Sequence, residues 1–230
     1  MLSRKRPRVS SATGTWKPRK KARFTSRVTP SVGLRTGGWR GVPGRRGELK
    51  FVDVASNSTD FSATGVLVLL NGVAPGTGAS QRIGKKLVMK SLYFRAAIGS
   101  GVTGANVFRG HVRLLFIYDK QTNATAPTVS DILQQPFGSA AMNMDNRDRF
   151  VVISDKQFAI DQAGGHQSAF CKFFKKLNLQ TIFNAGTAGT VADISTGSVY
   201  LLLISDDTGS IGATNQPQIS YYNRIRYDDS

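Results

Sequence analysis

The residues best suited to chemistry in this 230-residue sequence are lysines and arginines that cluster near its N-terminus. One cluster is Arg4-Lys5-Arg6-Pro7-Arg8, and a second runs from Lys17 to Arg23. Such cations bind polyanions because each contact with a phosphate releases a condensed counterion. We therefore predict that nucleic acid is bound by Arg4, Lys5, Arg6, Arg8, Lys17, Arg19, Lys20, Lys21, Arg23, Arg27, Arg35, Arg40, Arg45 and Arg46.

Three aromatic residues, Trp16, Phe24 and Trp39, are interleaved with these charges. Aromatic rings stack on unpaired bases, so one interpretation is base stacking; docking of the segment against the folded part of the protein is an equal alternative. The two clusters also have the spacing of a bipartite nuclear-import signal. That signal would comprise Arg4, Lys5, Arg6, Arg8, Lys17, Arg19, Lys20, Lys21 and Arg23. A solvated tail without a binding role is the plain alternative.

The net charge of +17 is unevenly distributed along the chain. Residues 1–50 hold 15 basic residues and one acidic residue, a net charge of +14, whereas residues 51–230 hold 16 basic and 13 acidic residues, a net charge of +3. The first segment repels itself and has few apolar groups, so burial cannot offset the entropy lost on ordering it. We predict a disordered Arg/Lys-rich arm over residues 1–46 and one folded domain over residues 47–230.

A second group of cations, Arg82, Lys85 and Lys86, follows a Gly-rich turn. Residues 79–86 nearly match a phosphate-binding loop, but Ala79 stands where that motif has Gly, and Lys86 stands where it has Ser or Thr. The segment also leads into a predicted strand, so no helix N-terminus would receive the phosphates. We expect a loop between strands whose three cations contact nucleic acid, and no nucleotide hydrolysis.

The remaining reactive residues are too few for catalysis. His166 and Cys171 are the only imidazole and thiol close in sequence, and a thiol nucleophile also needs a positioned base and an oxyanion site. The single cysteine excludes an intrachain disulfide and fits a reducing compartment.

The pairs Asp206-Asp207 and Asp228-Asp229 could hold calcium between subunits, although such pairs are more often solvated turn residues. We expect no enzyme, no cofactor, no resident metal and no membrane insertion, since no apolar run of 18 residues is present.

From Glu48 onward, eight short segments have the composition and turn-rich flanks of β-strands. They are 48–55, 64–70, 86–98, 107–118, 149–153, 170–180, 198–204 and 218–227. Several alternate apolar and polar residues with the period of two that a half-buried sheet requires. In segment 170–180, Cys171, Phe173, Leu177 and Leu179 form the apolar face, and Lys172, Lys176, Asn178 and Gln180 form the polar face. Segment 86–98 alternates poorly.

The connections between these segments differ in length. We expect the long connection 121–147 to contain one short helix over 128–134, capped by Thr128 or Ser130. We expect 181–197, which is small and polar, to be an exposed loop. Eight strands with little helix predict an all-β fold, either an eight-stranded jelly-roll sandwich or a closed barrel.

Four segments of the predicted domain carry a resemblance to a known family. They are Glu48-Leu49-Lys50-Phe51, Leu70-Asn71-Gly72-Val73, residues 76–86 and Met89-Lys90-Ser91. Together with the plan of a basic arm followed by strands, they resemble the capsid proteins of small circular single-stranded DNA viruses. This replication-protein-encoding group includes circoviruses and geminiviruses.

The resemblance implies a single jelly roll, an icosahedral shell of about 60 copies, and an arm that binds single-stranded DNA inside the virion. It also implies entry into the host nucleus through a nuclear-import receptor. The fold is similar to that of the satellite necrosis viruses of plants, which package RNA, so RNA is an alternative. Because the chain is short for a geminivirus coat protein and has no Cys/His cluster, we do not expect a twinned shell. A cellular basic nucleic-acid-binding module is the alternative from another class, but it would spread its basic residues over the folded face.

Overall fold

The structure is a computed structural model that describes residues 49–100, 108–161, 164–207 and 216–229. The strands in these residues are β1 (Leu49–Asp60), β2 (Val66–Leu69), β3 (Lys86–Ser100), β4 (Arg109–Asp119), β5 (Phe150–Asp161), β6 (Ala169–Phe183), β7 (Ile194–Thr196), β8 (Ser198–Ser205) and β9 (Pro217–Asp229). The helical turns are α1 (Val129–Ile132), η1 (Met144–Asn146) and η2 (Val191–Asp193). The prediction of an all-β fold is confirmed. The predicted boundary between arm and domain lies outside the described residues.

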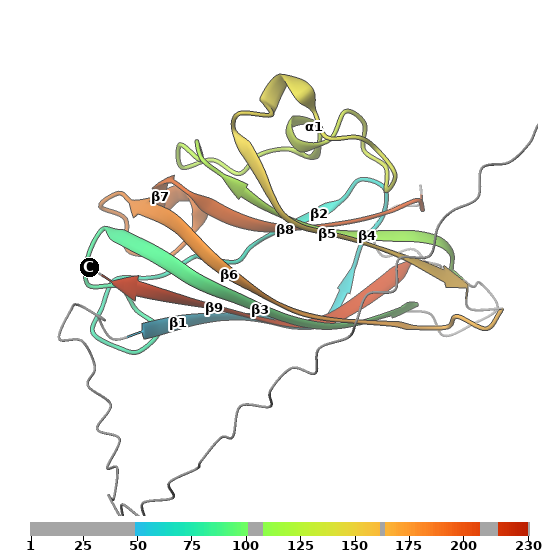
Figure 1. Ribbon diagram of the computed structural model, residues 1–230, viewed down its shortest axis with the longest axis horizontal. Coiled ribbons are helices and arrows are strands. Elements are labelled where there is room, and N and C mark those ends of the chain that lie inside the picture. Colours follow the sequence, from blue (N-terminus) through green and yellow to red (C-terminus); the bar gives the residue numbers. More distant parts are fainter. Residues whose placement is uncertain (1–48, 101–107, 162–163, 208–215, 230) are drawn as a thin grey trace, which may run out of the picture. The chain divides into compact units, whose positions relative to one another are not determined.

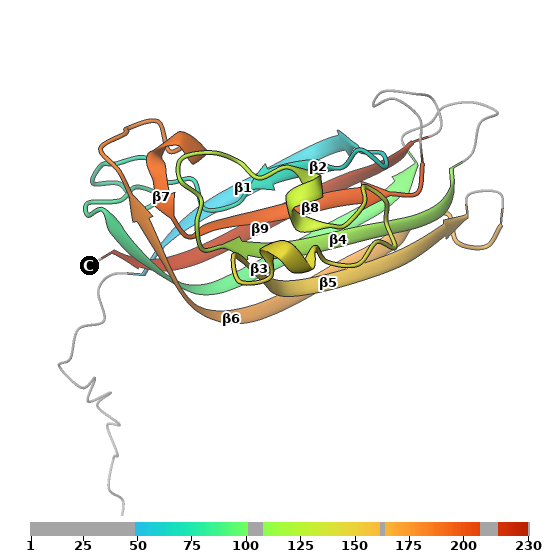
Figure 2. The same cartoon turned by 90° about the horizontal axis from the view of Figure 1, so that it is seen from above.

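The strands form two antiparallel sheets that lie face to face (Figures 1 and 2). One has five strands in the order β1-β9-β3-β6-β7, and the other has four in the order β2-β8-β4-β5. The chain crosses repeatedly from one sheet to the other, and β9 returns to lie between β1 and β3. This is the strand order of a jelly roll, so the sandwich alternative is correct and the closed barrel is not.

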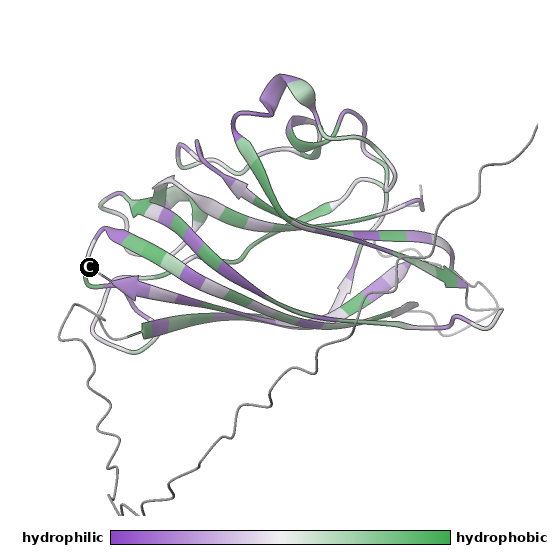
Figure 3. Ribbon diagram, viewed as in Figure 1, coloured by the Kyte–Doolittle hydropathy of each residue, from purple (hydrophilic) through white to green (hydrophobic). Residues whose placement is uncertain are grey.

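The space between the sheets is filled by apolar side chains from both inner faces. Phe94 of β3 packs edge-on against Phe116 of β4, with ring centroids 4.8 Å apart, and both rings contact Phe173 of β6. Figure 3 shows hydrophobic and hydrophilic residues alternating along the strands of the five-stranded sheet. One face of this sheet is therefore packed into the core and the other is polar, as the period of two predicts.

A β-bulge explains why the third predicted strand alternates poorly. The register of β3 against both of its neighbours shifts between Met89 and Ser91. Leu87 and Met89 are buried before the shift, and Leu92 and Phe94 are buried after it. The inserted residue thus exchanges odd for even positions on the core face.

The four-stranded sheet is covered on its outer face over β8 and the second half of β4, whereas β5 is largely exposed. Its outer face carries Leu115, Tyr200 and Leu202, which form a second apolar cluster with Ile132 and Leu133 of the connection between β4 and β5. This connection lies over the outer face (Figures 1 and 2). Every residue of β8 is buried as a result.

Helix α1 confirms the predicted helix in this connection but is shorter than predicted. Thr128 is the N-cap and forms a capping box with Asp131. The helix ends at Ile132 because Leu133 adopts an extended backbone and its side chain is buried in the second cluster.

The structure corrects several strand ends and one loop prediction, and the described residues contain nine strands where eight were predicted. Strand β5 continues from the predicted end at 153 to Asp161, because its polar second half pairs with β4 as an edge strand. Strand β6 continues to Phe183. The segment 181–197 is not simply an exposed loop, since it contains β7, which pairs with β6, and its residues Phe183 and Ile194 are buried.

Candidate nucleic-acid interface

The predicted arm residues lie outside the described residues. This applies to the cations Arg4, Lys5, Arg6, Arg8, Lys17, Arg19, Lys20, Lys21, Arg23, Arg27, Arg35, Arg40, Arg45 and Arg46, and to Trp16, Phe24 and Trp39. Their contacts with nucleic acid and with an import receptor stay predictions.

The other three predicted cations, Arg82, Lys85 and Lys86, lie in or next to the loop before β3. One of them has a structural role and the other two are exposed. Arg82 is 4% exposed, and its guanidinium donates hydrogen bonds to the carbonyls of Val73 (3.1 Å), Gly84 (3.2 Å) and Gly186 (2.7 Å). These bonds commit Arg82 to holding the loop together. Lys85 and Lys86 are exposed, and their contact with nucleic acid stays a prediction; the loop leads into a strand, not a helix.

Asp229, at the end of β9, fixes this loop from the opposite side. Its carboxylate accepts hydrogen bonds from the amides of Ile83 (2.5 Å) and Gly84 (3.0 Å) and from Lys50 Nζ (3.2 Å). Burial raises the pKa of Asp229, but the two amides and the Lys50 ammonium outweigh burial and hold this pKa below its ordinary value. The carboxylate is thus used in a structural contact.

The candidate calcium ligands are engaged in similar local contacts. Asp228 lies 3.9 Å from Lys90 Nζ, and Asp206 accepts a hydrogen bond from the amide of His111 at 3.3 Å. Within the described residues, no group of three or more His, Cys, Asp or Glu side chains is placed to hold a metal ion.

Cys171 lies on the apolar face of β6, as predicted, and is buried. Burial raises the pKa of its thiol, so the reactive thiolate form is disfavoured at neutral pH. This environment is that of a structural cysteine in a core.

An array of cations lies on the outer face of the five-stranded sheet. Cross-strand partners share a face of a sheet, and four rows of partners run across β1, β9, β3 and β6. The rows are Phe51–Arg226–Ser91–Lys176, Asp53–Arg224–Tyr93–Phe174, Ala55–Tyr222–Arg95–Lys172 and Ser220–Ala97–Phe170. We call these four rows the basic face.

The basic face carries five cations and one acid, a net charge of +4. The acid, Asp53, is neutralised by Arg224, which donates two hydrogen bonds of 2.7 Å to its carboxylate, and Tyr222 donates a third at 2.8 Å. The hydrogen bonds from Arg224 are the main reason that the pKa of Asp53 is below its ordinary value. Arg224 also lies over the ring of Phe51, 4.5 Å from its centroid, so this cation is held in place while the others remain available.

The sequence interpretation identified only part of this face. It placed Lys172 and Lys176 on the polar side of their strand, which the structure confirms. It missed Phe170 and Phe174, two aromatic residues on that same polar side, which are 79% and 60% exposed. Their spacing of four residues along a strand, in phase with the lysines, was the available signal.

Two sheets with this strand order define the class of single-jelly-roll proteins, which includes viral capsid domains. Residues 3–228 match the model of the geminivirus coat protein/nuclear export factor BR1 family. The chain therefore belongs to this family, whose capsid proteins are non-enzymatic, and the predicted resemblance is confirmed.

Individual relatives are distant. The chain is 24% identical over 159 residues to the capsid protein of Miscanthus streak virus (isolate 91), with 60% of this chain and 62% of that protein covered. It is 26% identical over 152 residues to the capsid protein of Tomato yellow leaf curl Sardinia virus (62% and 58% covered). It is 24% identical over 178 residues to the capsid protein of African cassava mosaic virus (isolate West Kenyan 844), with 72% and 67% covered. The matches thus span only about three fifths to two thirds of these proteins.

Among solved structures, that of the infectious bursal disease virus Gx strain aligns with a TM-score of 0.31 and 11% identity, covering 79% of this chain and 32% of that chain. The jelly roll is defined by the strand order itself. No helix among the described residues is long and apolar enough to cross a membrane.

Proposed function

We propose that this coat-protein homologue assembles with its own copies into a closed shell of about 60 subunits and packages single-stranded DNA through its basic arm. The observation that carries the proposal is the charge distribution: +14 in residues 1–50 and +3 in residues 51–230. A cationic segment joined to a nearly balanced domain suits a molecule that binds a polyanion on one side and its own copies laterally. Membership of the coat-protein family supports the same reading.

The charge is sufficient for a small genome. In a shell of about 60 copies, the N-terminal segments would bring about 840 positive charges, against one negative charge per nucleotide. That charge would neutralise a large share of a genome of roughly one to two kilobases.

The test combines mass and nucleic-acid content. We expect the purified full-length chain to form megadalton particles in size-exclusion chromatography and electron microscopy. Deletion of residues 2–46 should leave a folded domain whose particles contain little nucleic acid. A full-length variant with glutamine at the nine basic positions of the two arm clusters controls for arm length, and it should package much less nucleic acid than the wild-type chain. Wild-type nucleic-acid content in the deletion would contradict the role of the arm.

The same purified protein tests two alternatives: a cellular binding module in place of a shell protein, and an RNA cargo in place of DNA. A cellular binding module would remain a monomer or dimer at neutral pH with and without DNA, which would contradict the shell. Digestion of the packaged nucleic acid by DNase, and not by RNase, distinguishes a DNA cargo from the RNA alternative. If the two clusters act as a nuclear-import signal, a fluorescent fusion of the wild-type chain should accumulate in the nucleus, and a fusion of the glutamine variant should not.

A further inference from the structure

The basic face has a feature that simple charge binding does not require: exposed aromatic rings placed among the cations. Phe170 is 79% exposed and Phe174 is 60% exposed, whereas Phe173 between them is packed into the core. Leaving such rings in water forgoes the stabilisation that burial would give. Neighbouring exposed rings on one face indicate a surface that is covered in the functional state.

The rings alternate with cations along β6. The outward residues of this strand are, in order, Phe170, Lys172, Phe174 and Lys176. Successive outward residues of a strand are about 6.6 Å apart, so Lys172 lies between two rings and Lys176 lies beside one. Single-stranded nucleic acid offers the complementary alternation, a flat base and an anionic phosphate in every nucleotide.

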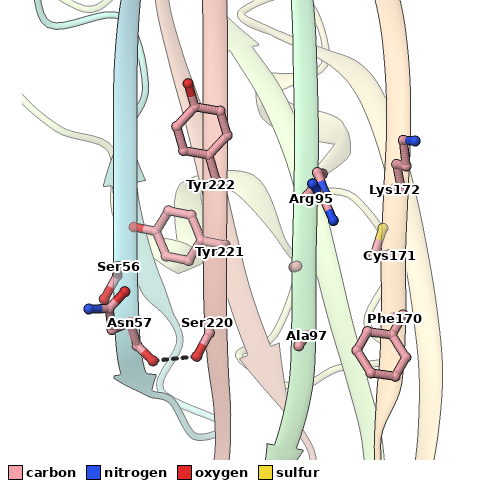
Figure 4. Close-up of a pocket in the computed structure, with 11 residues that line it drawn as sticks. Ser56, Asn57, Arg95, Ala97, Phe170, Cys171, Lys172, Ser220, Tyr221 and Tyr222 are labelled. Carbon is pink, nitrogen blue, oxygen red and sulfur yellow. Dashed lines mark hydrogen bonds between the residues drawn. The ribbon is translucent and has the colours of Figure 1, made fainter.

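A hollow lies beside Phe170 because its neighbours in the row are small. Ala97 is its partner on β3 and Ser220 is the next residue across on β9. The resulting hollow has a volume of about 450 Å³. Figure 4 shows its residues on the four neighbouring strands, with the ring of Phe170 beside Ala97 and the cations Arg95 and Lys172 next to each other.

The rim of this hollow can recognise a nucleotide. Phe170 offers a ring for stacking, Arg95 and Lys172 offer positive charge for a phosphate, and Asn57 brings an amide with both donor and acceptor groups for the edge of a base. The Ser220 hydroxyl donates a hydrogen bond to the backbone carbonyl of Asn57, which ties β9 to β1 at this point and leaves the Asn57 side chain free of this bond.

A second hollow of about 330 Å³ repeats the pattern farther along the sheet. It is lined by Tyr93, Phe174, Ser91, Arg224 and Arg226, and it shares Tyr222 with the first hollow. Phe170 and Phe174 are four residues apart, or about 13 Å along the strand. The two hollows therefore form two consecutive subsites on one surface.

The charge of the face selects the kind of partner. Arg95, Lys172, Lys176 and Arg226 make no ion pair with any residue that the structure describes. A second copy presenting the same face would be repelled by its net charge of +4. Exposed rings gain no stacking contact from a duplex, since its bases are already stacked and paired. The complementary ligand is a polyanion with unpaired bases.

We infer that the basic face is a second nucleic-acid site, in which Phe170 and Phe174 stack unpaired bases of a single strand and Arg95 and Lys172 bind the phosphate between them. The inference rests on the proposed function for the identity of the ligand. It differs from that proposal in assigning base contacts to the folded domain and not to the arm.

The test uses the full-length chain with the nine arm-cluster residues replaced by glutamine, so that the arm does not mask the sheet. In this background, Phe170→Ala and Phe174→Ala should each weaken binding of a short oligothymidylate by about 5- to 150-fold, the range found for loss of one stacked base. Binding of a duplex of equal charge should change less than twofold. Ala97→Leu, which fills the first hollow and keeps every ring and charge, should reproduce the loss at that subsite. Phe137→Ala, at an exposed ring in the connection over the other sheet, is the matched control and should bind as its parent does.

Photo-crosslinking of wild-type protein to an oligonucleotide containing 5-iodouracil gives an independent readout. We expect crosslinked peptides that contain Phe170 or Phe174. Crosslinks confined to residues 1–46 would overturn the inference and leave the packaging proposal intact. Loss of particle assembly in Phe170→Ala/Phe174→Ala, with unchanged affinity for oligothymidylate, would also overturn it, because the face would then be a contact between copies. Failure of the arm variant to lose packaging would count against the proposed function alone.

Discussion

A buried arginine, Arg113 of β4, is predicted to hold the long connection between β4 and β5 onto the sandwich. Its side chain is 7% exposed. The guanidinium binds Asp155 of β5 with two bonds of 2.9 and 2.6 Å, and it donates to the carbonyls of Gly138 (3.2 Å) and Ala140 (2.6 Å) in the connection. Arg113 lies on the same face of β4 as Arg109 and His111 because alternate residues of a strand share a face, and the connection covers that face at Arg113.

Replacing Arg113 with methionine keeps much of the volume and removes all four bonds. The carbonyls of Gly138 and Ala140 lose their donor while they stay buried, and each such loss costs about 1–3 kcal/mol. Asp155 is 36% exposed, so water takes over part of its solvation and the loss of the ion pair adds only about 1 kcal/mol. We expect Arg113→Met to lower the free energy of unfolding by about 3–5 kcal/mol. In a domain of this size, that corresponds to about 6–20 °C in Tm.

Arg109→Met is the matched control, on the same strand. Arg109 pairs with Asp161 at 3.3 Å, but the two side chains are 63% and 49% exposed. An exposed pair contributes about 0–1 kcal/mol, so Tm should fall by less than about 4 °C. Calorimetry should compare the proteins in the same oligomeric state, because subunit association itself raises Tm. Equal losses in the two variants would refute the reasoning, as would unchanged amide-exchange protection around Gly138 and Ala140 in Arg113→Met.

Two further predictions concern carboxylates with lowered pKa values. Asp53→Asn should release Arg224 on the basic face, so the plot of log K for single-stranded DNA against log salt should become steeper by about 0.7; an unchanged slope would mean that Arg224 stays unavailable. The pKa of Asp131 is held below its ordinary value of 3.8, first by the Thr128 amide and then by its hydroxyl. A lowered folded-state pKa gives stability that is present above about pH 4 and is lost as the pH falls through the folded value, so Asp131→Asn should flatten the decline of the urea midpoint between about pH 4 and pH 2. Identical pH profiles for the two proteins would contradict the capping role of Asp131.

Much of the fold follows from local periodicity. Strands such as β6 and β9 alternate cleanly because one face of their sheet is packed and the other is bare. Sequence patterns failed where tertiary contacts override the period. The bulge at Met89–Ser91 changes which positions of β3 face the core, and no propensity marks such an insertion. Strand β7 has only three residues, Ile194–Thr196, and exists because the extended end of β6 offers it a partner.

The sequence showed which residue types would form the candidate site, but not which of these residues are available to bind a ligand. Arg82 looked like Lys85 and Lys86 in sequence, and only the carbonyls of Val73, Gly84 and Gly186 turn it into a structural residue. These carbonyls come from segments more than 100 residues apart in the chain. Long-range backbone contacts of this kind cannot be read from the spacing of charged residues.

The positive charge of the domain is concentrated on one of its faces. Residues 51–230 sum to +3, which suggested a domain with little electrostatic character. The basic face alone holds +4, so everything else in those residues sums to −1. The connection over the four-stranded sheet covers that sheet's outer face at β8 and the second half of β4, whereas nothing among the described residues covers the outer face of the five-stranded sheet in this way. The arm leads in sequence directly into β1 of this same sheet. If the chain packages nucleic acid as proposed, a single strand would find on the outer face of this sheet a positively charged surface that also offers rings for its bases.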